Sequence, residues 1–212
     1  MNDQEISRSF SNHKEKIRCN GNLFIISAPS GAGKTTLCRA VLDDPIPDML
    51  YSVSYTTRKP RKGEQNGIDY YFITENDFKN RIKNGQWAEW AEVYGNYYGT
   101  SSEFIDKVLA SGRDILLDID FQGTLQIFDQ YHDSISIFIM PPSLDILKLR
   151  LESRGTDSKQ IISRRIDAAE KEMKNKNFYR YVIINDKLSV AIDDLISIIE
   201  KYRTGRNTDI VK

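Results

Sequence analysis

The sequence predicts an α/β fold in which a central parallel sheet is covered by helices on both faces. Short apolar, β-rich runs alternate with longer segments of helical periodicity, which is typical of parallel strands joined by crossover helices. The first apolar run, Leu23 to Ser27, leads into a glycine-rich turn that opens a helix. A later run, Asp114 to Asp120, ends in aspartates. In such sheets ligands lie outside the carboxyl ends of the strands.

The glycine-rich turn after the first run is predicted to bind phosphate. It is close to the P-loop pattern G-x-x-x-x-G-K-[ST] and has the strand–turn–helix setting that this motif requires. An ordinary glycine-rich loop is the alternative. Ala28 stands where the pattern has glycine, and we expect this smallest substitution to be tolerated. The predicted loop consists of Ala28, Pro29, Ser30, Gly31, Ala32, Gly33, Lys34, Thr35 and Thr36.

The residue types in this turn suit a phosphate ligand. Gly31 and Gly33 permit a backbone shape whose N–H groups point at the anion, and the helix start favours negative charge. Lys34 can reach the outer phosphates, and the Thr35 hydroxyl can bind Mg²⁺.

Composition limits the classes of function that this protein can have. The chain has 212 residues, of which 40% are hydrophobic, enough for one domain with inserted subdomains. Its 30 basic and 30 acidic residues cancel, which argues against a nucleic-acid or membrane partner and requires any anion site to be local. Two cysteines and two histidines are too few and too scattered for a zinc site.

The N-terminal region carries no targeting signal that we recognise. Residues 1–20 contain acids and lack an apolar core, unlike a secretory or transit peptide, and we expect a flexible extension. No apolar run approaches the roughly 20 residues of a membrane span. The sequence therefore predicts a reduced, cytoplasmic protein.

A basic loop and an aromatic region follow the first helix. Tyr51 to Ser54 is predicted to form a short strand, and four cations then surround Pro60, in residues 58–62. A solvated loop explains these cations equally well. Residues 66–99 are rich in aromatic and turn residues, which predicts a small strand-rich lobe. Its tyrosines serve packing in most proteins, but beside arginines they can also hydrogen-bond phosphate.

The middle of the chain returns to alternating helices and strands. Thr100 to Glu103 fits a capping box, and the helix that it opens should end near Gly112. The aspartates after the following strand, Asp118 and Asp120, can direct carboxylates toward Mg²⁺ or a substrate. They can also be simple turn residues.

The last third contains a cationic helical arm. Ser134 to Met140 is predicted to be a strand, and a helix should begin near Ser143. Arginines on two helical stretches then flank a polar turn, as in a lid, although solvated surface arginines are the alternative. A final strand from Tyr181 to Asp186 and an amphipathic helix from Val190 to Tyr202 complete the sheet pattern.

Together these motifs resemble the guanylate kinase family, over about residues 21–204. The resemblance depends on six segments in order, listed by their first and last residues: Ser27–Thr35, Ser54–Arg61, Asn66–Tyr70, Gly95–Thr100, Leu117–Gly123 and Leu151–Asp157. It implies a P-loop three-layer fold with a guanylate kinase-like domain at 21–204, an inserted GMP-binding lobe at about 54–104, a helical lid at about 148–166, and a tail at 205–212.

The resemblance also implies roles for single residues, with ATP as donor, Mg²⁺ as its metal at Thr35, and GMP as acceptor. The catalytic residues would be Lys34, Arg61, Arg154 and Arg165, and Asn185 and Asp186 would lie near adenine. Residues expected to contact GMP or lie beside it are Ser54, Arg58, Arg61, Tyr70, Glu89, Tyr98, Thr100, Asp118 and Asp120.

Such residues suit phosphoryl transfer, which needs positioning and cations more than a strong base. Two alternatives stay open at this point. The first is a guanylate-kinase-like module that has lost catalysis and binds phosphoproteins, but such modules typically lack an intact P-loop. The second is a kinase for another nucleoside monophosphate, such as AMP or dTMP. The sequence leaves the oligomeric state open, a homo-oligomer included.

Overall fold

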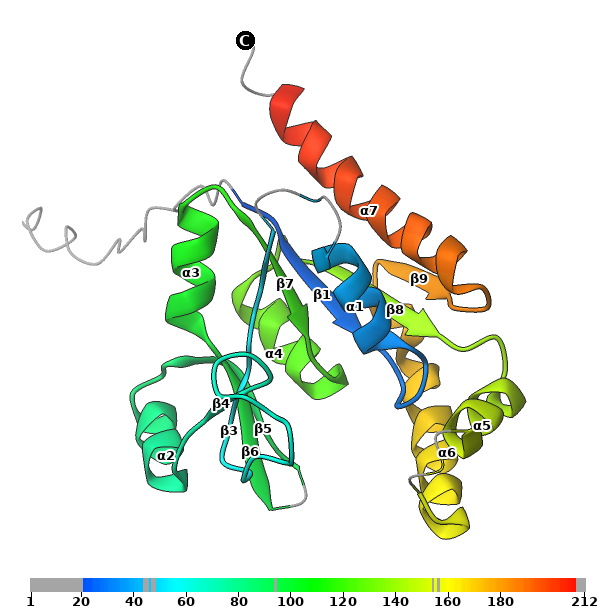
Figure 1. Cartoon of the computed structure of the whole chain (residues 1–212). Coiled ribbons are helices and arrows are strands. Elements are labelled where there is room, and N and C mark those ends of the chain that lie inside the picture. Colours follow the sequence, from blue (N-terminus) through cyan, green and yellow to red (C-terminus); the bar gives the residue numbers. More distant parts are fainter. Residues whose placement is uncertain are drawn as a thin grey trace, which may run out of the picture.

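The computed structural model describes residues 21–208 except 44, 45, 47, 48, 94, 154 and 156. A central sheet lies between two layers of helices, with a small strand-rich lobe and a helical arm extending from it (Figure 1). This confirms the predicted α/β fold. The predicted N-terminal extension, residues 1–20, lies outside the described residues.

The central sheet has five parallel strands in the order β2-β7-β1-β8-β9. Since β1 lies between β7 and β8, the loops after these three strands meet at one edge of the sheet. The strands are β1 Leu23–Ser27, β2 Met49–Tyr51, β7 Asp114–Asp118, β8 Ile135–Met140 and β9 Tyr181–Ile184.

Alternation along β1 builds two cores. Phe24 and Ile26 pack with Leu37 of α1 and Leu195 of α7 on one face, whereas Ile25 packs with residues of α3 and α4 on the other. Successive side chains of a strand point to opposite faces, so β1 is buried on both sides. The helices of these layers are α1 Lys34–Asp43, α3 Ser102–Ala110, α4 Phe121–Gln130 and α7 Leu188–Thr208.

The small lobe is a four-stranded sheet in the order β4-β3-β6-β5, with one helix packed on it. The buried ring of Phe78, from that helix, stacks on Trp87 at a centroid distance of 4.3 Å. The elements are β3 Tyr55–Thr56, β4 Tyr71–Phe72, α2 Glu75–Lys83, β5 Trp87–Val93 and β6 Asn96–Ser101.

Helix α4 joins the small lobe to the central domain. The Gln126 side chain donates to Trp90 O at 2.9 Å and accepts from Trp90 N at 3.1 Å, and Gln130 donates to Ala88 O at 2.8 Å. These amides bind the edge of β5 that faces away from β6. No strand pairs with that edge among the described residues. The lobe is therefore attached through side-chain hydrogen bonds to a core helix.

The helical arm consists of α5 Leu144–Ser153 and α6 Lys159–Met173, followed by the 3₁₀ turn η1 Lys174–Phe178. The two helices share a small core of Leu147, Leu151, Ile162 and Ala169. A methyl group on Gly31 would lie 2.9 Å from a Leu151 methyl carbon. The base of the arm therefore packs directly on the glycine-rich turn.

Several predicted boundaries were wrong. The strand expected at Tyr51 to Ser54 is β2, at Met49–Tyr51. The cap of α3 is Ser101, the last residue of β6, whose hydroxyl accepts from Phe104 N, whereas the Thr100 hydroxyl donates to Glu89. The run from Asp114 ends at Asp118, and α7 continues to Thr208 instead of ending at Tyr202.

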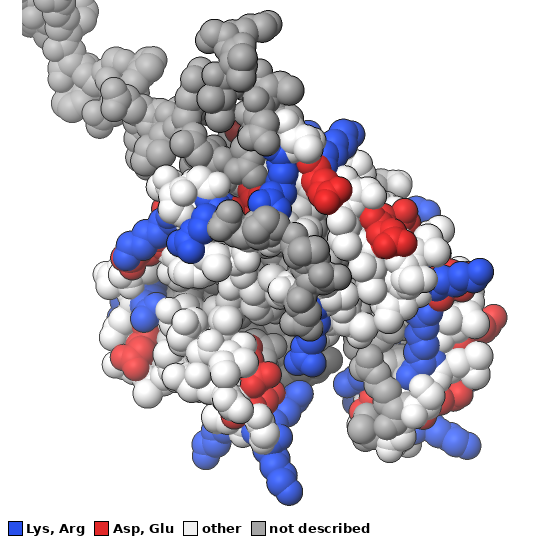
Figure 2. All heavy atoms as spheres, turned by 45° about the horizontal axis from the view of Figure 1, so that its top comes forward, with Lys and Arg blue, Asp and Glu red and all other residues white. Residues whose placement is uncertain are grey.

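Charge is dispersed over the face of the molecule that Figure 2 shows. Figure 2 shows both signs scattered over one face of the molecule, with no large area of a single sign. Within the described ranges no helix is long and apolar enough to span a bilayer.

We expect Ile127→Ala to destabilise the fold by about 2–5 kcal/mol, because Ile127 is fully buried between α4 and the sheet. Leu125→Ala is the matched control on the same helix. Leu125 is 39% exposed, so its loss should cost less than about 1 kcal/mol. Urea denaturation measures both, and equal losses would contradict this description of the core.

Candidate active site

The glycine-rich turn adopts a shape that only glycine favours at two positions. Gly31 has φ 93° and Gly33 has φ 98°, in the left-handed region. A methyl group on Gly33 would also lie 2.3 Å from Asn185 Nδ2. Ala28 fits without strain, because its side chain packs against the core cluster around Phe24. The turn runs directly from β1 into α1, which begins at Lys34.

Lys34 is held by a carboxylate on the neighbouring strand. Its ammonium forms an ion pair with Asp118, the last residue of β7. Burial alone would lower the pKa of Lys34, but the attraction of Asp118 raises it above its ordinary value. Lys34 is therefore a permanent cation at the edge of the sheet.

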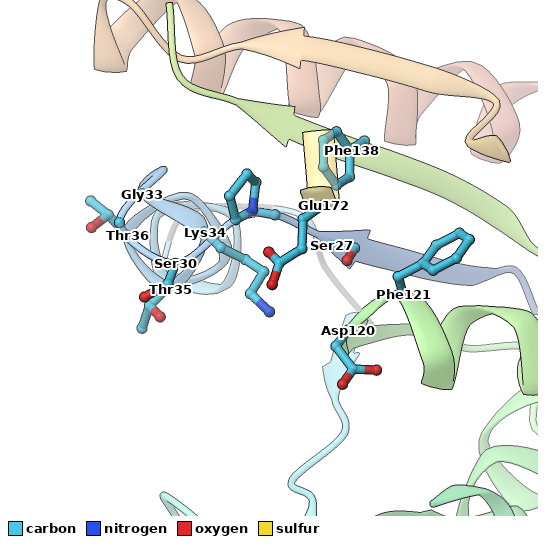
Figure 3. A pocket seen from close by; sticks show the side chains of 13 residues that line it. Ser27, Ser30, Gly33, Lys34, Thr35, Thr36, Asp120, Phe121, Phe138 and Glu172 are labelled. Carbon is cyan, nitrogen blue, oxygen red and sulfur yellow. The ribbon is translucent and has the colours of Figure 1, made fainter. Parts of the chain in front are cut away.

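A hollow of about 350 Å³ opens in front of the turn (Figure 3). The turn and the start of α1 form one wall, and Thr35 and Thr36 are exposed there. The remainder of the lining is formed by Asp120 and Phe121 at the start of α4, Phe138 of β8 and Glu172 of α6. Its lining combines one ammonium with carboxylates, hydroxyls and two aromatic rings.

A second hollow of about 330 Å³ lies on the other side of the turn, between Gly31, Arg150 and Asn185. Asn185 is 4% exposed and donates from Nδ2 to Ala32 O at 2.8 Å. Its Oδ1 is a buried acceptor for which the structure gives no partner. The Arg150 guanidinium donates to Asn185 O at 2.8 Å. Asp186 also lines this hollow.

The small lobe carries a compact group of cations, tyrosines and a carboxylate. The Arg58 guanidinium makes two hydrogen bonds of 2.9 Å to Glu64 and lies 5.4 Å from the centre of the Tyr70 ring. Tyr70 meets Tyr98 edge to face at 6.0 Å. Arg61 is exposed, and its backbone N–H donates to Glu64 at 2.7 Å. Hydrogen bonds from Arg58 and Arg61 lower the pKa of Glu64.

Glu89 lies inside the lobe and is 6% exposed. Its carboxylate accepts from Thr100 Oγ1 at 2.6 Å. A methyl group on Gly123 would lie 2.7 Å from Oε2. Burial, opposed by this hydrogen bond and reinforced by the charge of Asp120, raises the pKa of Glu89 to about 7. Glu89 is therefore a buried carboxyl and not a surface residue.

The other predicted positions lie in the same region. Asp120 caps α4 and accepts from Gly123 N at 2.8 Å. Ser54 precedes β3, and its carbonyl accepts from Tyr71 N at 2.9 Å. Burial raises the pKa of Tyr70, and the charges of Arg58 and Lys34 oppose this rise.

The arginines of the arm differ in what the structure shows. Arg165 pairs with Asp157 at 3.0 Å, and it does not line either hollow. Arg154 lies outside the described residues. The structure therefore does not bring Arg165 together with Lys34.

Sequence reasoning missed three features of the site. Glu64 follows Arg61 in the basic loop. Four cations precede it there, and they directed attention away from this single carboxylate. Glu172 lies seven residues after Arg165 on α6, on the same helical face, and this spacing could have revealed it. Phe138 appeared to be an ordinary residue of a buried strand.

No group of three or more His, Cys, Asp or Glu side chains that could hold a metal ion is present in the part of the chain that the structure describes. Thr35, Asp118 and Asp120 supply hydroxyl and carboxylate oxygens near the turn. These are the ligand types that Mg²⁺ prefers, with waters completing its shell. The donor set thus fits a magnesium ion that arrives with a nucleotide.

Comparison with known proteins agrees with this geometry. The family model "Guanylate kinase" matches residues 20–202. The guanylate kinase of Geobacter metallireducens is 49% identical over 193 residues, which cover 90% of this chain and 95% of that protein. That of Dechloromonas aromatica is 50% identical over 179 residues, covering 84% and 88%.

A solved structure is similar as well. The crystal structure of guanylate kinase from Anaplasma phagocytophilum superposes with a TM-score of 0.70 at 33% identity and covers 86% of each chain. Sequence and fold agree over the region that holds the glycine-rich turn, the lobe and the arm. This chain therefore belongs to the guanylate kinase family.

Proposed function

We propose that this protein transfers the γ-phosphoryl group of ATP to GMP, giving ADP and GDP. Family membership supports this activity. The observation that supports it is the position of Lys34 in the glycine-rich turn, on the same hollow as Asp120, at the start of the helix whose Gly123 approaches the buried Glu89. A phosphate donor and a base-bearing phosphate acceptor can meet there.

The donor would lie along the turn. In this proposal the backbone N–H groups of Gly31 to Thr36, together with Lys34, hold the ATP phosphates. Adenine would occupy the hollow beside Asn185 and Asp186. The buried Oδ1 of Asn185 is an acceptor there, and the amino group of adenine is a donor.

The acceptor phosphate would bind in the lobe. Arg58, Arg61, Tyr70 and Tyr98 provide cationic and hydroxyl donors that suit a phosphate. Glu64 would act as a positioning residue, since it fixes the Arg58 guanidinium with two hydrogen bonds. The aromatic rings beneath Arg58 limit its movement further.

Guanine would be recognised by its hydrogen-bond donors. Its N1–H and amino group can donate to the carboxylate of Glu89, whereas adenine presents a bare acceptor at N1. Thr100 orients Glu89, and Ser54 and Asp120 lie where further contacts to the base are expected. In this proposal one buried carboxylate explains a preference for GMP over AMP.

In the reaction an oxygen of the GMP phosphate forms a bond to the γ-phosphorus, and the bond from that phosphorus to the β–γ bridging oxygen breaks. Negative charge spreads over the oxygens in the transition state, so cations do most of the catalysis. In this proposal Lys34 would act on the donor side and Arg61 on the acceptor side, and Arg154 and Arg165 would come from the arm when it closes.

Magnesium would be held through the Thr35 hydroxyl, with Asp118 and Asp120 accepting from its waters. When bound with ATP, it neutralises charge on the β- and γ-phosphates. The proposal also includes a cytoplasmic location and a role in purine nucleotide metabolism, in keeping with ATP and GMP as the substrates. Neither nucleic acid nor a membrane is needed as a partner, and the oligomeric state stays open.

A coupled assay of ADP formation tests the activity, with GMP, AMP, CMP and UMP offered as acceptors. We expect GMP to be strongly preferred. In the Lys34→Ala variant kcat should collapse while the fold, followed by circular dichroism, stays the same, because Lys34 stabilises the transferring group. Near-normal turnover by this variant would remove the turn from the catalytic site.

Arg165→Ala should lower kcat by several orders of magnitude, since an inserted arginine is worth roughly 10³ to 10⁵ in related reactions. GMP affinity, measured by calorimetry without ATP, should change little because Arg165 lies in the arm. Asp157→Asn frees Arg165 without removing its charge and should retain most of the activity. Equal losses of kcat and GMP affinity in Arg165→Ala would instead assign Arg165 to the GMP site.

Glu89→Gln should weaken GMP binding by up to roughly 10⁴-fold, mostly through KM, because one carboxylate oxygen becomes a donor. AMP should become relatively less disfavoured. Since the carboxylate form accepts from guanine and its pKa is about 7, the wild-type KM for GMP should rise as pH falls below 7. The variant should lack this part of the pH dependence. Glu92→Gln, an exposed change on the same strand, serves as the control.

The same raised pKa means that the ionised form of Glu89 destabilises the folded state. A raised pKa in the folded protein means that the carboxyl contributes stability below its unfolded value near 4.5, which is lost as pH rises through about 7. Glu89→Gln should therefore be more stable than wild type at pH 8 and similar at pH 4.5, measured by thermal unfolding. An unchanged difference across this window would show that burial does not perturb Glu89.

A further inference from the structure

Glu172 brings a carboxylate into the hollow where the ATP phosphates are proposed to bind. It belongs to the last turn of α6 and lines the hollow together with Gly31, Lys34 and Thr35. Figure 3 shows its carboxylate directed into the hollow, on the side of Lys34. An acid at this position is unexpected, because the glycine-rich turn opposite it, with Lys34, suits an anion.

The hollow holds more acid than its described cation can balance. Lys34 is already paired with Asp118, and Asp120 and Glu172 face the same space. Burial raises the pKa of Glu172, the charge of Lys34 lowers it and that of Asp120 raises it further. A free triphosphate entering here meets a net negative wall. A triphosphate that carries a divalent cation does not.

The root of the arm holds Glu172 close to the sheet. After η1 the chain reaches Tyr179, whose side chain is 6% exposed. Its ring contacts Phe138 at a centroid distance of 4.8 Å, and its hydroxyl donates to Thr124 at 3.4 Å. Ala169, three residues before Glu172, is buried in the core of the arm. The chain is therefore held on both sides of Glu172, which keeps this residue beside the hollow.

We propose that Glu172 is a specificity-determining residue for the phosphoryl donor, which admits the divalent-cation complex of a nucleoside triphosphate and disfavours the metal-free anion. This inference rests on the proposed function of the hollow. Its carboxylate would accept hydrogen bonds from the waters of the cation, since the described carboxylates are too dispersed to coordinate one directly. Without the cation it repels the phosphates.

The test is calorimetric binding of ATP without GMP, once with Mg²⁺ and once with EDTA, for wild type and Glu172→Gln. The two affinities should move in opposite directions. Magnesium–ATP should bind more weakly to the variant and metal-free ATP more tightly, so that the ratio of the two dissociation constants changes by roughly tenfold. Glu170→Gln is the matched control. Glu170 lies on the same helix, pairs with Lys174 at 3.8 Å and does not line the hollow.

Losses of similar size in both affinities would assign Glu172 a purely structural role, and an unchanged ratio would overturn the proposal. Glu172→Asp keeps the charge and should keep the wild-type direction of preference. Should Glu172→Gln fail to fold, Glu172→Ala provides the same comparison. A wild-type protein that binds neither form of ATP would instead overturn the proposed function.

Discussion

The ion pair between Lys34 and Asp118 joins the two strands on which the site depends. β1 and β7 are adjacent and parallel, with Ile26 opposite Asp118, so the turn after one strand meets the carboxylate that ends the other. This carboxylate keeps Lys34 charged although burial disfavours the charge. The pairing of Lys34 with Asp118 therefore depends on β1 and β7 being neighbours in the sheet. The two apolar cores on either side of β1 stabilise this arrangement.

The acceptor side is assembled by α4. Its cap, Asp120, faces the hollow in front of the turn, and Gly123 in its first turn allows Glu89 to approach. Two glutamines further along the helix hold the edge of β5 through its backbone. One helix thus sets the distance between the donor and acceptor regions. In the proposed function, the buried carboxylate with a pKa of about 7 would gain hydrogen bonds when a guanine binds.

The arm combines a fixed root with a polar tip. Leu147 and Leu151 pack next to Gly31 at the root. Glu172 lines the hollow in front of the turn from the same end of the arm. Toward the tip, Arg165 is paired with Asp157. Such a pair is partly exposed and weak enough to exchange for a phosphate. In the proposed function, the tip of the arm would respond to a nucleotide while its base stays with the turn.

The sequence by itself determined the architecture and the turn. Short apolar runs of strand length, helical spacing between them and the glycines at 31 and 33 are local patterns, and they predicted the three layers and the position of Lys34. Boundaries were less certain because Thr100 and Ser101 both suit a helix cap, and only the pairing of β6 with β5 assigns Thr100 to the strand. Tertiary structure alone decided the burial of Glu89, the pairing of Arg58 with Glu64 and the presence of Glu172 in the hollow. The burial of Glu89 and the position of Glu172 depend on segments that meet across the fold, whereas Arg58 and Glu64 meet through the folding of their own loop. The electrostatics of a carboxylate follow from such neighbours rather than from its place in the chain.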